Sequence, residues 1–165
     1  MHSVFLGLGS NVGDREQHIS DALTLLPVKQ VSALYETSPV YNEEQDWFLN
    51  CAVEITTELS PQALMQELLK IEAQLGRTRT AKNGPRIIDI DILLYDDLIL
   101  DEEGLKIPHP GITERLFVLE PLNELCPEKK HPVLKKHIGA LHADLDTEQQ
   151  IKPYNPTRPQ TPSRA

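Results

Sequence analysis

Two acidic side chains interrupt an otherwise apolar stretch, IIDIDILLY at residues 87–95. If this stretch is a β-strand, Asp89 and Asp91 point to the same face with their Cα atoms about 6.5 Å apart. Two ionised carboxylates that close repel each other and resist burial unless a cation lies between them. Mg²⁺ is commonly held by one or two carboxylates together with phosphate oxygens and water. The spacing favours a Mg²⁺ site, whereas two solvated aspartates on an exposed sheet face are the alternative.

A basic segment directly precedes this strand. Its cations are Arg77, Arg79, Lys82 and Arg86, in a chain whose formal net charge is −9. Arginine pairs bidentately with phosphate oxygens, and these cations would balance a phosphate-rich ligand that a metal bridges to the aspartates. His109 and Arg115, within IPHPGITERLF, are two further candidate phosphate contacts. The context therefore favours the metal and phosphate interpretation over solvated aspartates.

The glycine-rich start, GLGSNVGD, does not match a phosphate-binding loop. It lacks the G-K-[ST] ending of a P-loop, and its glycines miss the G-x-G-x-x-G spacing by one residue. We interpret it as a tight turn between a strand and a helix, with Asn11 or Gly13 at positive φ.

Composition and net charge argue against several classes of protein. A net charge of −9 over 165 residues argues against nucleic-acid binding, because nonspecific affinity comes mainly from Lys and Arg. No apolar run approaches the roughly 18 residues of a membrane span, so we expect a cytoplasmic protein without membrane contact. Cys51 and Cys126 lie far apart without metal-type spacing, and we expect both to be reduced.

The elements that would position these residues follow from apolar periodicity. Helices are expected from the Asp14 cap to Pro27 and from Ser60–Pro61 to Gly76. Strands are expected at residues 3–10, 31–36, 51–57 and 87–95. The order β-α-β-β-α-β predicts an α+β fold, the ferredoxin-like split βαβ arrangement, with helices packed on an antiparallel sheet.

The alternation of apolar and polar residues predicts which side chains of each strand are buried. Val31, Ala33 and Tyr35 would be buried in one half-buried strand, and Cys51, Val53, Ile55 and Thr57 in the next, opposite exposed Glu54 and Thr56. In the acidic strand, Ile88, Ile90, Ile92 and Leu94 would fill the face opposite the aspartates.

Later segments are less regular. LKIPHP reads as a short extended piece, and Thr113 to Leu125 as a third helix interrupted or ended near Pro121. We expect one domain over residues 1–150 and a proline-rich tail over 151–165, disordered or lying along the surface.

Five motifs together resemble one enzyme family. They are GLGSNVGD, YETSPVY, FLNCAVEI, GPRIIDIDILLY and IPHPGITERLFVLEPL, spread over roughly residues 4–127. In order and spacing they are similar to the 6-hydroxymethyl-7,8-dihydropterin pyrophosphokinases of folate biosynthesis. The resemblance implies transfer of a pyrophosphoryl group from ATP to the pterin hydroxymethyl oxygen, with release of AMP and two Mg²⁺ ions as cofactors.

The resemblance also implies roles for individual residues. The catalytic residues would be Asp89 and Asp91, which would bind both metal ions, with Arg77 and Arg86. ATP would contact Glu72, Arg77, Arg79, Arg86, Ile92, Lys106, His109 and Arg115. The pterin would contact Thr37, Val40, Phe48, Asn50 and Phe117, with the two phenylalanines stacking on its flat rings.

Two positions depart from the family pattern. The family usually has an aromatic residue directly before GPR, where this chain has Asn83. Trp47, in another segment, could cover the pocket instead or simply anchor its loop. Gly104 and Lys106 stand where relatives have an arginine and a threonine that can contact ATP, and Lys106 could compensate.

The sequence does not assign a protein general base, because Asp91 and a metal-bound hydroxyl are both conceivable.

We expect a monomer or weak dimer whose partners are the two small substrates. The rival class is a non-catalytic ferredoxin-like module that senses a ligand or binds RNA, and RNA binding fits the charge poorly.

Overall fold

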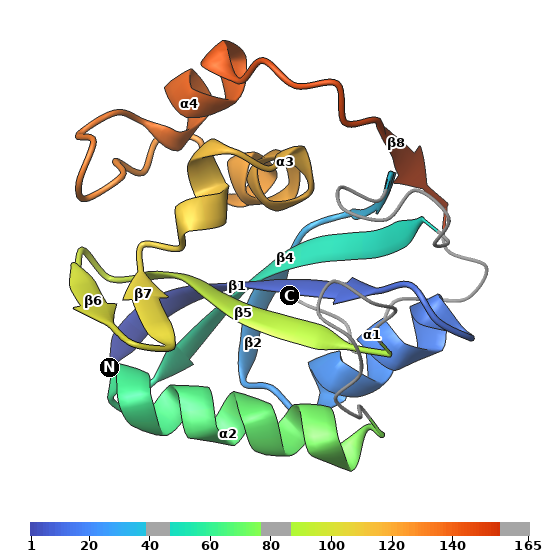
Figure 1. The fold of residues 1–165 in the computed structure, drawn as a ribbon. Helices are drawn as coiled ribbons and strands as arrows, with labels where there is room; N and C mark the ends of the chain where they lie inside the picture. The colour runs from blue at the N-terminus through green and yellow to red at the C-terminus, as the bar shows by residue number, and fades with distance from the viewer. Residues whose placement is uncertain (39–46, 77–86, 156–165) are drawn as a thin grey trace.

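The computed structural model describes residues 1–38, 47–76 and 87–155. One antiparallel sheet runs through the middle of the protein, with helices on both of its faces (Figure 1). Among the described helices, none combines the length and apolar character needed to cross a membrane.

Six strands of the described chain form this sheet, in the order β5-β1-β4-β3-β8, with β2 also paired to β4. Every pairing is antiparallel. The strands are β1 (His2–Ser10), β2 (Val28–Val31), β3 (Leu34–Thr37), β4 (Phe48–Thr57), β5 (Asp89–Tyr95) and β8 (Ile151–Tyr154). Apart from β8, this is the predicted split βαβ arrangement, and the α+β fold is confirmed.

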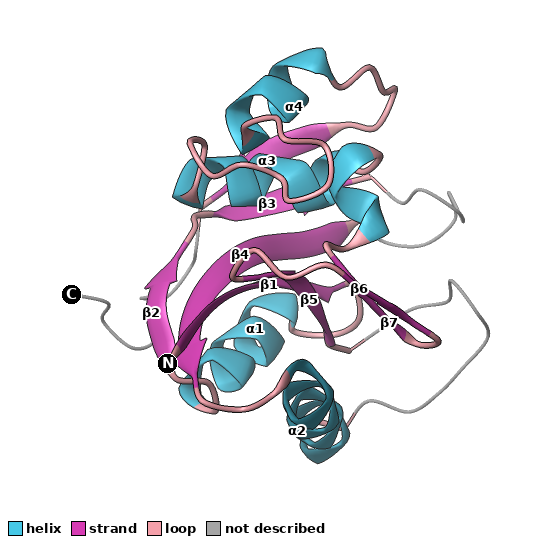
Figure 2. Ribbon diagram, turned by 90° about the vertical axis from the view of Figure 1, so that its left-hand side faces the viewer, coloured by secondary structure: helices cyan, strands magenta, loops and turns pink. Residues whose placement is uncertain are grey.

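Helices lie on both sides of the sheet (Figure 2). On one face lie α1 (Arg15–Thr24) and α2 (Pro61–Gln74), and on the other lies α3 (Leu116–Leu125), with α4 (Ile138–Asp144) packed on its outer side. Both predicted caps are present: Gln17 N donates to Asp14 Oδ1 at 3.1 Å, and Ala63 N donates to Ser60 Oγ at 3.1 Å. The turn before α1 places Gly13 at φ 67°, as predicted.

The strand β4 is buried on both faces, which corrects the prediction of a half-buried strand. It lies between β1 and β3, and α3 packs over the face that we expected to be exposed. Glu54 is therefore only 7% exposed, and its carboxylate accepts hydrogen bonds from Ser3 Oγ at 2.8 Å and Gln30 Nε2 at 2.7 Å. The packing of α3 on this second face, which the sequence of β4 alone does not indicate, explains this burial.

A register shift between Phe5 and Leu6 corrects the predicted faces of β5. Ile92 is opposite Leu6, but Leu94 is opposite Phe5, so Leu93 is an extra residue. Ile88, Ile90 and Ile92 pack in the core beneath α1 and α2 as predicted, whereas Leu93 and Leu94 pack with Phe5 beneath α3. A bulge adds one residue to one strand and reverses the alternation beyond it, so the expectation for Leu94 was wrong.

The strand predicted at residues 31–36 is instead two strands, β2 and β3. Leu34, which was expected to be exposed, is buried at 2% exposure, whereas Ala33 is exposed. Between the two strands, Ser32 N donates to Ala52 O, and Ser32 Oγ accepts from Ala52 N at 2.9 Å. These local hydrogen bonds at Ser32 break the alternation on which the prediction rested.

The third helix also differs from the prediction. Residues Pro110–Thr113 form a short 3₁₀ helix, Arg115 is extended at φ −123°, and α3 begins only at Leu116. Pro121 lies inside α3 and does not end it. Its missing N–H deprives the carbonyl of Phe117 of one helical partner, a loss that burial of Pro121, Leu119 and Leu122 offsets.

Three elements were not predicted. A separate hairpin pairs β6 (Leu100–Glu102) with β7 (Leu105–Ile107), which is the first part of the expected extended piece, and Gly104 turns the hairpin at φ 80°. The helix α4 packs on α3. The first residues of the expected tail form β8, which pairs with β3. Cys51 and Cys126 are free, as expected.

Candidate active site

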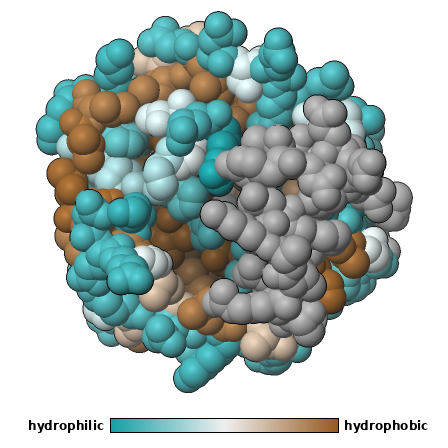
Figure 3. Space-filling model, viewed as in Figure 1, coloured by the Kyte–Doolittle hydropathy of each residue, from teal (hydrophilic) through white to brown (hydrophobic). Residues whose placement is uncertain are grey.

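A cavity of about 480 Å³ opens beside the edge strand β5. In the face shown in Figure 3, the molecule is hollowed between α2 and the β6–β7 hairpin, and apolar side chains form the floor. Helix α2, strand β5, strand β7 and the 3₁₀ helix each contribute to the wall. The lining residues include Met65, Leu69, Glu72, Asp89, Asp91, Ile92, Lys106, His109 and Arg115.

The two aspartates point to the α3 side of the sheet. Across the strand pair, Gly9 is opposite Asp89 and Gly7 is opposite Asp91. Because both neighbours on β1 are glycines, β1 itself places no side chain beside the carboxylates. Within residues 1–38, 47–76 and 87–155, no group of three or more acidic, histidine or cysteine side chains could hold a metal ion. The pair fits Mg²⁺, which takes its other ligands from phosphate oxygens and water.

Glu72 connects α2 to the acidic strand. Its side chain is buried at 5% exposure, and Oε2 accepts a hydrogen bond of 2.7 Å from the backbone amide of Ile90. An edge strand leaves outward-facing amides without a ladder partner, and Glu72 satisfies one of them. The residue predicted to contact ATP thus lines the cavity and also fixes β5 in place.

His109 and Arg115 lie on the opposite wall. Nδ1 of His109 accepts a hydrogen bond of 2.9 Å from Gly111 N. Burial lowers the pKa of His109, the Arg115 cation lowers it further, and Asp89 partly opposes both. His109 is therefore neutral near pH 7, with its proton on Nε2, and can donate one hydrogen bond. Gly111 leaves room for both side chains, because a β-carbon there would lie only 3.0 Å from the His109 ring and 3.2 Å from Arg115 Cδ.

Two further predicted contacts also line the cavity. Lys106 extends from β7 and forms an ion pair with Asp101 at 2.5 Å, across the hairpin. Ile92 belongs to the apolar part of the wall, together with Met65 and Leu69 of α2. We call Glu72, Asp89, Asp91, Ile92, Lys106, His109 and Arg115 the carboxylate half of the site.

A pair of parallel aromatic rings lies on the same side of the sheet. Phe48 begins β4, Phe117 lies in the first turn of α3, and their ring centroids are 6.5 Å apart with planes only 13° from parallel. A flat ring that stacks between the two phenylalanines makes contacts of about 3.5 Å on each side, so their planes would be about 7 Å apart. The spacing is thus close to what a flat heterocycle requires between the two rings.

A buried polar pair lies beside the aromatic rings. Thr37 Oγ1 and Asn50 Oδ1 are 2.5 Å apart, and both residues are buried. The hydroxyl donates to the amide oxygen, so it fixes which way the Asn50 amide faces. We call Thr37, Phe48, Asn50 and Phe117 the aromatic half of the site.

Gly9 separates the two halves, and sequence reasoning missed its role. It is opposite Asn50 on β4 and opposite Asp89 on β5. A β-carbon there would lie 2.7 Å from Asn50 Nδ2, closer than two such atoms can approach. The signal was present in GLGS, whose glycines we assigned only to a turn.

Five residues named in the sequence analysis lie outside the described residues: Val40, Arg77, Arg79, Asn83 and Arg86. The structure brings together the other predicted site residues in the two halves just described.

Comparison with known families shows which family this chain belongs to. Residues 5–127 match the model of the 7,8-dihydro-6-hydroxymethylpterin-pyrophosphokinase (HPPK) family. The chain belongs to this family. The predicted resemblance is thereby confirmed.

Relatives of known name agree with the HPPK assignment. A Bacillus subtilis 2-amino-4-hydroxy-6-hydroxymethyldihydropteridine pyrophosphokinase is 48% identical over 128 residues, which are 74% of this chain and 77% of that protein. An Aquifex aeolicus protein of the same name is 39% identical over 93% of this chain and 96% of its own length. A Dictyostelium discoideum folic acid synthesis protein is 44% identical over 79% of this chain, which spans only 20% of that longer protein.

A solved structure supports the HPPK fold. The Plasmodium falciparum HPPK-DHPS with pteroate superposes with a TM-score of 0.72 at 19% identity, over 86% of this chain and 44% of that one. At this identity the likeness concerns the fold alone.

Trp47 has contacts that favour the anchoring interpretation over the pocket cover. Its ring lies 5.1 Å from Lys152 Nζ on β8, and its carbonyl accepts a hydrogen bond of 2.9 Å from Arg15. It directly precedes Phe48 at the start of β4, and successive residues of a strand point to opposite faces. Its contacts therefore hold β8 against the sheet.

Proposed function

We propose that the chain transfers the pyrophosphoryl group of ATP to the hydroxymethyl oxygen of 6-hydroxymethyl-7,8-dihydropterin, a step of folate biosynthesis. The products are AMP and the pterin diphosphate. The observation that carries this proposal is the placement of the Asp89–Asp91 pair and the aromatic half on one face of the sheet, on either side of Gly9. A triphosphate held by one half and a flat ring held by the other would meet above this glycine.

The aromatic half would bind and orient the pterin. Its rings would enter between Phe48 and Phe117, and the Asn50 amide, held by Thr37, would pair with the polar edge of the ring. Val40 is proposed to complete this pocket. Such a fixed pose directs the hydroxymethyl group toward Asp89 and Asp91, and positioning of this kind accounts for much of the rate in phosphoryl transfer.

The carboxylate half would bind the triphosphate. Asp89 and Asp91 would hold Mg²⁺, and we propose two ions, as in the predicted family pattern. Bound there, Mg²⁺ would supply charge compensation for the transferring phosphates. The remaining oxygens would be neutralised by Arg77, Arg79, Arg86, Lys106, His109 and Arg115, and we propose Arg77 and Arg86 as catalytic residues among them. Glu72 and Ile92 would line the nucleotide site.

The bonds that change are few. The hydroxymethyl oxygen attacks the β-phosphorus, the bond from that phosphorus to the oxygen shared with the α-phosphate breaks, and AMP leaves with that oxygen. The hydroxymethyl proton is released to the solvent in the same step. The protein need supply no nucleophile, so positioning and charge stabilisation carry the reaction. We further propose a cytoplasmic monomer or weak dimer.

Product analysis tests the proposal. Incubation with Mg·ATP and 6-hydroxymethyl-7,8-dihydropterin should give AMP and the pterin diphosphate in equal amounts. Formation of ADP would indicate transfer of one phosphoryl group and would overturn the proposal. Absence of pterin-dependent turnover, with retained Mg²⁺-dependent ATP binding, would indicate a non-catalytic binding module.

A further inference from the structure

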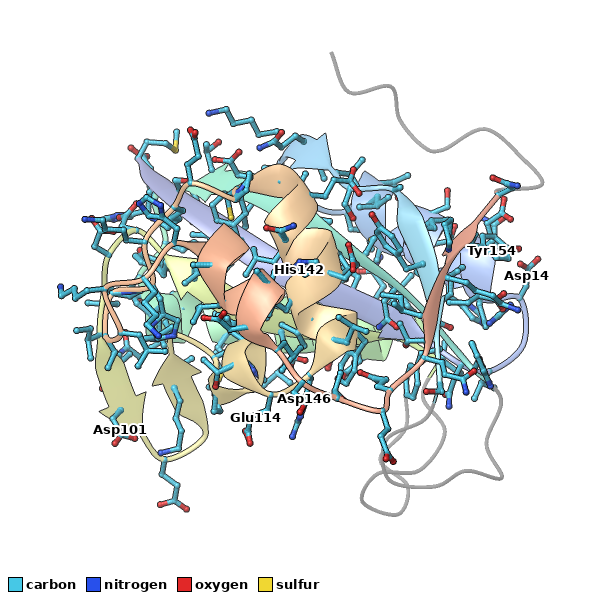
Figure 4. The ribbon with its side chains drawn as sticks, turned by 90° about the horizontal axis from the view of Figure 1, so that it is seen from above. Asp14, Asp101, Glu114, His142, Asp146 and Tyr154 are labelled. Atoms are coloured by element: carbon cyan, nitrogen blue, oxygen red, sulfur yellow. The ribbon has the colours of Figure 1, made fainter. Side chains whose placement is uncertain are left out.

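The C-terminal segment, residues 149–154, lies against the aromatic half of the site. Its strand β8 pairs with β3 so that Ile151 is opposite Thr37 and Tyr154 is opposite Leu34. In Figure 4, Tyr154 lies at the same end of the molecule as Asp14, where α1 begins. The hydroxyl of Tyr154 donates to Glu16 Oε1 at 3.2 Å, which ties the end of β8 to α1. The segment is therefore an integral part of the sheet next to the site.

The first turn of α3 lacks a cap from its own N-terminal residue. The opening amides of a helix have no partner within the helix and need one elsewhere. Arg115 occupies the N-cap position but makes no side-chain cap hydrogen bond. Instead, the amide of Phe117 donates to Oε1 of Gln149 at 3.2 Å, a residue 32 positions further along the chain. Gln149 thus caps the helix turn that carries one of the two stacking rings.

The other end of the same side chain reaches β3. Nε2 of Gln149 donates to the carbonyl of Ser38 at 2.9 Å. Ser38 is further held by Gln150, whose backbone amide donates to Ser38 Oγ and whose carbonyl accepts from Ser38 N, both at 2.9 Å. The residue before Ser38 is Thr37, which is opposite Phe48 in the sheet register. One amide side chain therefore joins the helix of Phe117 to the strand end beside Phe48.

We propose that Gln149 is a positioning residue for the pterin. By joining Phe117 to the end of β3, it holds the two rings at the near-parallel 6.5 Å spacing that a flat heterocycle enters. The inference rests on the proposed function and deepens it, because it adds a residue outside the family match at 5–127 to the substrate site. Gln149 acts through Phe117 and is not expected to touch the reacting atoms.

The test replaces Gln149 and its neighbour in the same way. Gln149→Leu removes both hydrogen bonds, whereas Gln150→Leu changes an exposed side chain that forms no hydrogen bond within the described residues. We expect Gln149→Leu to raise the KM for the pterin about three- to tenfold, the range expected for losing one or two neutral hydrogen bonds. The KM for ATP and the kcat at saturating pterin should stay unchanged, and Gln150→Leu should resemble the parent.

A conservative variant separates positioning from general loosening. Gln149→Glu keeps an acceptor for the Phe117 amide but cannot donate to Ser38, so only part of the lost pterin affinity should return. Binding of 6-hydroxymethylpterin, followed by its own fluorescence, is measured for every variant, so the inference is tested without turnover. Failure of the unsubstituted protein to form AMP would overturn the proposed function alone.

Other outcomes would overturn the role of Gln149. One is an unchanged KM and pterin affinity in Gln149→Leu. Another is an equal loss in Gln149→Leu and Gln150→Leu, or a fall in kcat and ATP affinity together with a lower melting temperature, because these would indicate a structural role only.

Discussion

Asp89 and Asp91 of the carboxylate half lie on the same face of the sheet as the aromatic half, but the two halves are assembled in different ways. The carboxylate half comes from neighbouring stretches of chain, α2, β5, β7 and the 3₁₀ helix, between residues 61 and 115. The aromatic half joins β3, β4 and α3, and its bracing side chain, Gln149, lies near the C-terminus. Charge is concentrated in the first half, whereas the second depends on ring spacing and one oriented amide.

This difference indicates how each half should fail. Loss of a charge in the carboxylate half removes an interaction with the transferring phosphates and should reduce kcat. Loss of a shape-determining contact in the aromatic half should weaken pterin binding and leave ATP binding intact. Variants in either half can therefore be compared by their effects on kcat and on the two KM values.

The largest effect is expected from Asp91→Asn. Turnover should fall by about a hundredfold or more, because the metal-bound charge compensation is lost. The melting temperature should stay the same or rise, because one of two neighbouring like charges is removed. The measurements are AMP formation and thermal unfolding, with the exposed Asp97→Asn as control. A folded Asp91→Asn protein with near-normal turnover would exclude the metal role.

The next largest effect is expected from Phe117→Ala. Loss of one stacking ring should weaken pterin binding by on the order of 1–3 kcal/mol, or about five- to 150-fold. Dissociation constants are measured with a non-hydrolysable ATP analogue present. Trp47→Ala and Asn83→Ala should change pterin affinity little. If either weakens it as much as Phe117→Ala does, the aromatic half has a second cover.

A smaller effect on the same half is expected from Gly9→Ala. The new methyl group would lie 2.7 Å from Asn50 Nδ2 and force the amide away from its position. We expect the pterin KM to rise about tenfold, consistent with a lost polar contact. Gly7→Ala is the matched comparison, since its methyl group would lie 3.4 Å from Leu93, an ordinary contact. Equal effects of the two variants would argue against a specific role of Gly9.

The smallest effect concerns a histidine that lines neither half. His131 Nδ1 accepts hydrogen bonds from Val133 N at 3.3 Å and Leu134 N at 3.2 Å, and burial lowers its pKa. Above the unfolded pKa of about 6.5, the imidazole is neutral in both states and does not affect stability. Below it the unfolded chain takes up the proton first, so the free energy of unfolding falls as the pH falls.

Comparison with His131→Asn isolates the contribution of His131 to the pH dependence of the free energy of unfolding. An Asn keeps an acceptor but does not titrate, so the fall in unfolding free energy between pH 7 and about pH 5 should be smaller. Denaturant unfolding at several pH values measures it, and both KM values should stay unchanged. A variant with an unaltered pH dependence would assign the acid sensitivity to other groups.

Much of the carboxylate half could be predicted because its information is local. The D-x-D spacing, the Ser60 cap and the apolar stripe of α2 placed Asp89 and Asp91 on a strand and Glu72 on the helix beside it. The bulge at Leu93 could not be predicted, since it depends on pairing with β1. The same holds for burial of Glu54, which depends on α3 covering a strand some 60 residues earlier.

The aromatic half was predictable only through the family resemblance. Nothing in the separate stretches around Phe48 and Phe117 indicates that their rings are parallel, because that geometry arises from the packing of α3 on β4. The contribution of Gln149 was missed for the same reason. The residues just after it, which form β8, were assigned to a tail, because polar residues next to prolines carry no periodic signal of a strand.

The most direct test of the two-part site is a crystal structure with Mg²⁺, a non-hydrolysable ATP analogue and 6-hydroxymethylpterin. We expect the pterin ring between Phe48 and Phe117, its polar edge on Asn50, and its hydroxymethyl oxygen above Gly9, facing the β-phosphate held through Asp89 and Asp91. A pterin bound outside the Phe48–Phe117 pair, or with its hydroxymethyl group turned away from the two aspartates, would contradict this arrangement.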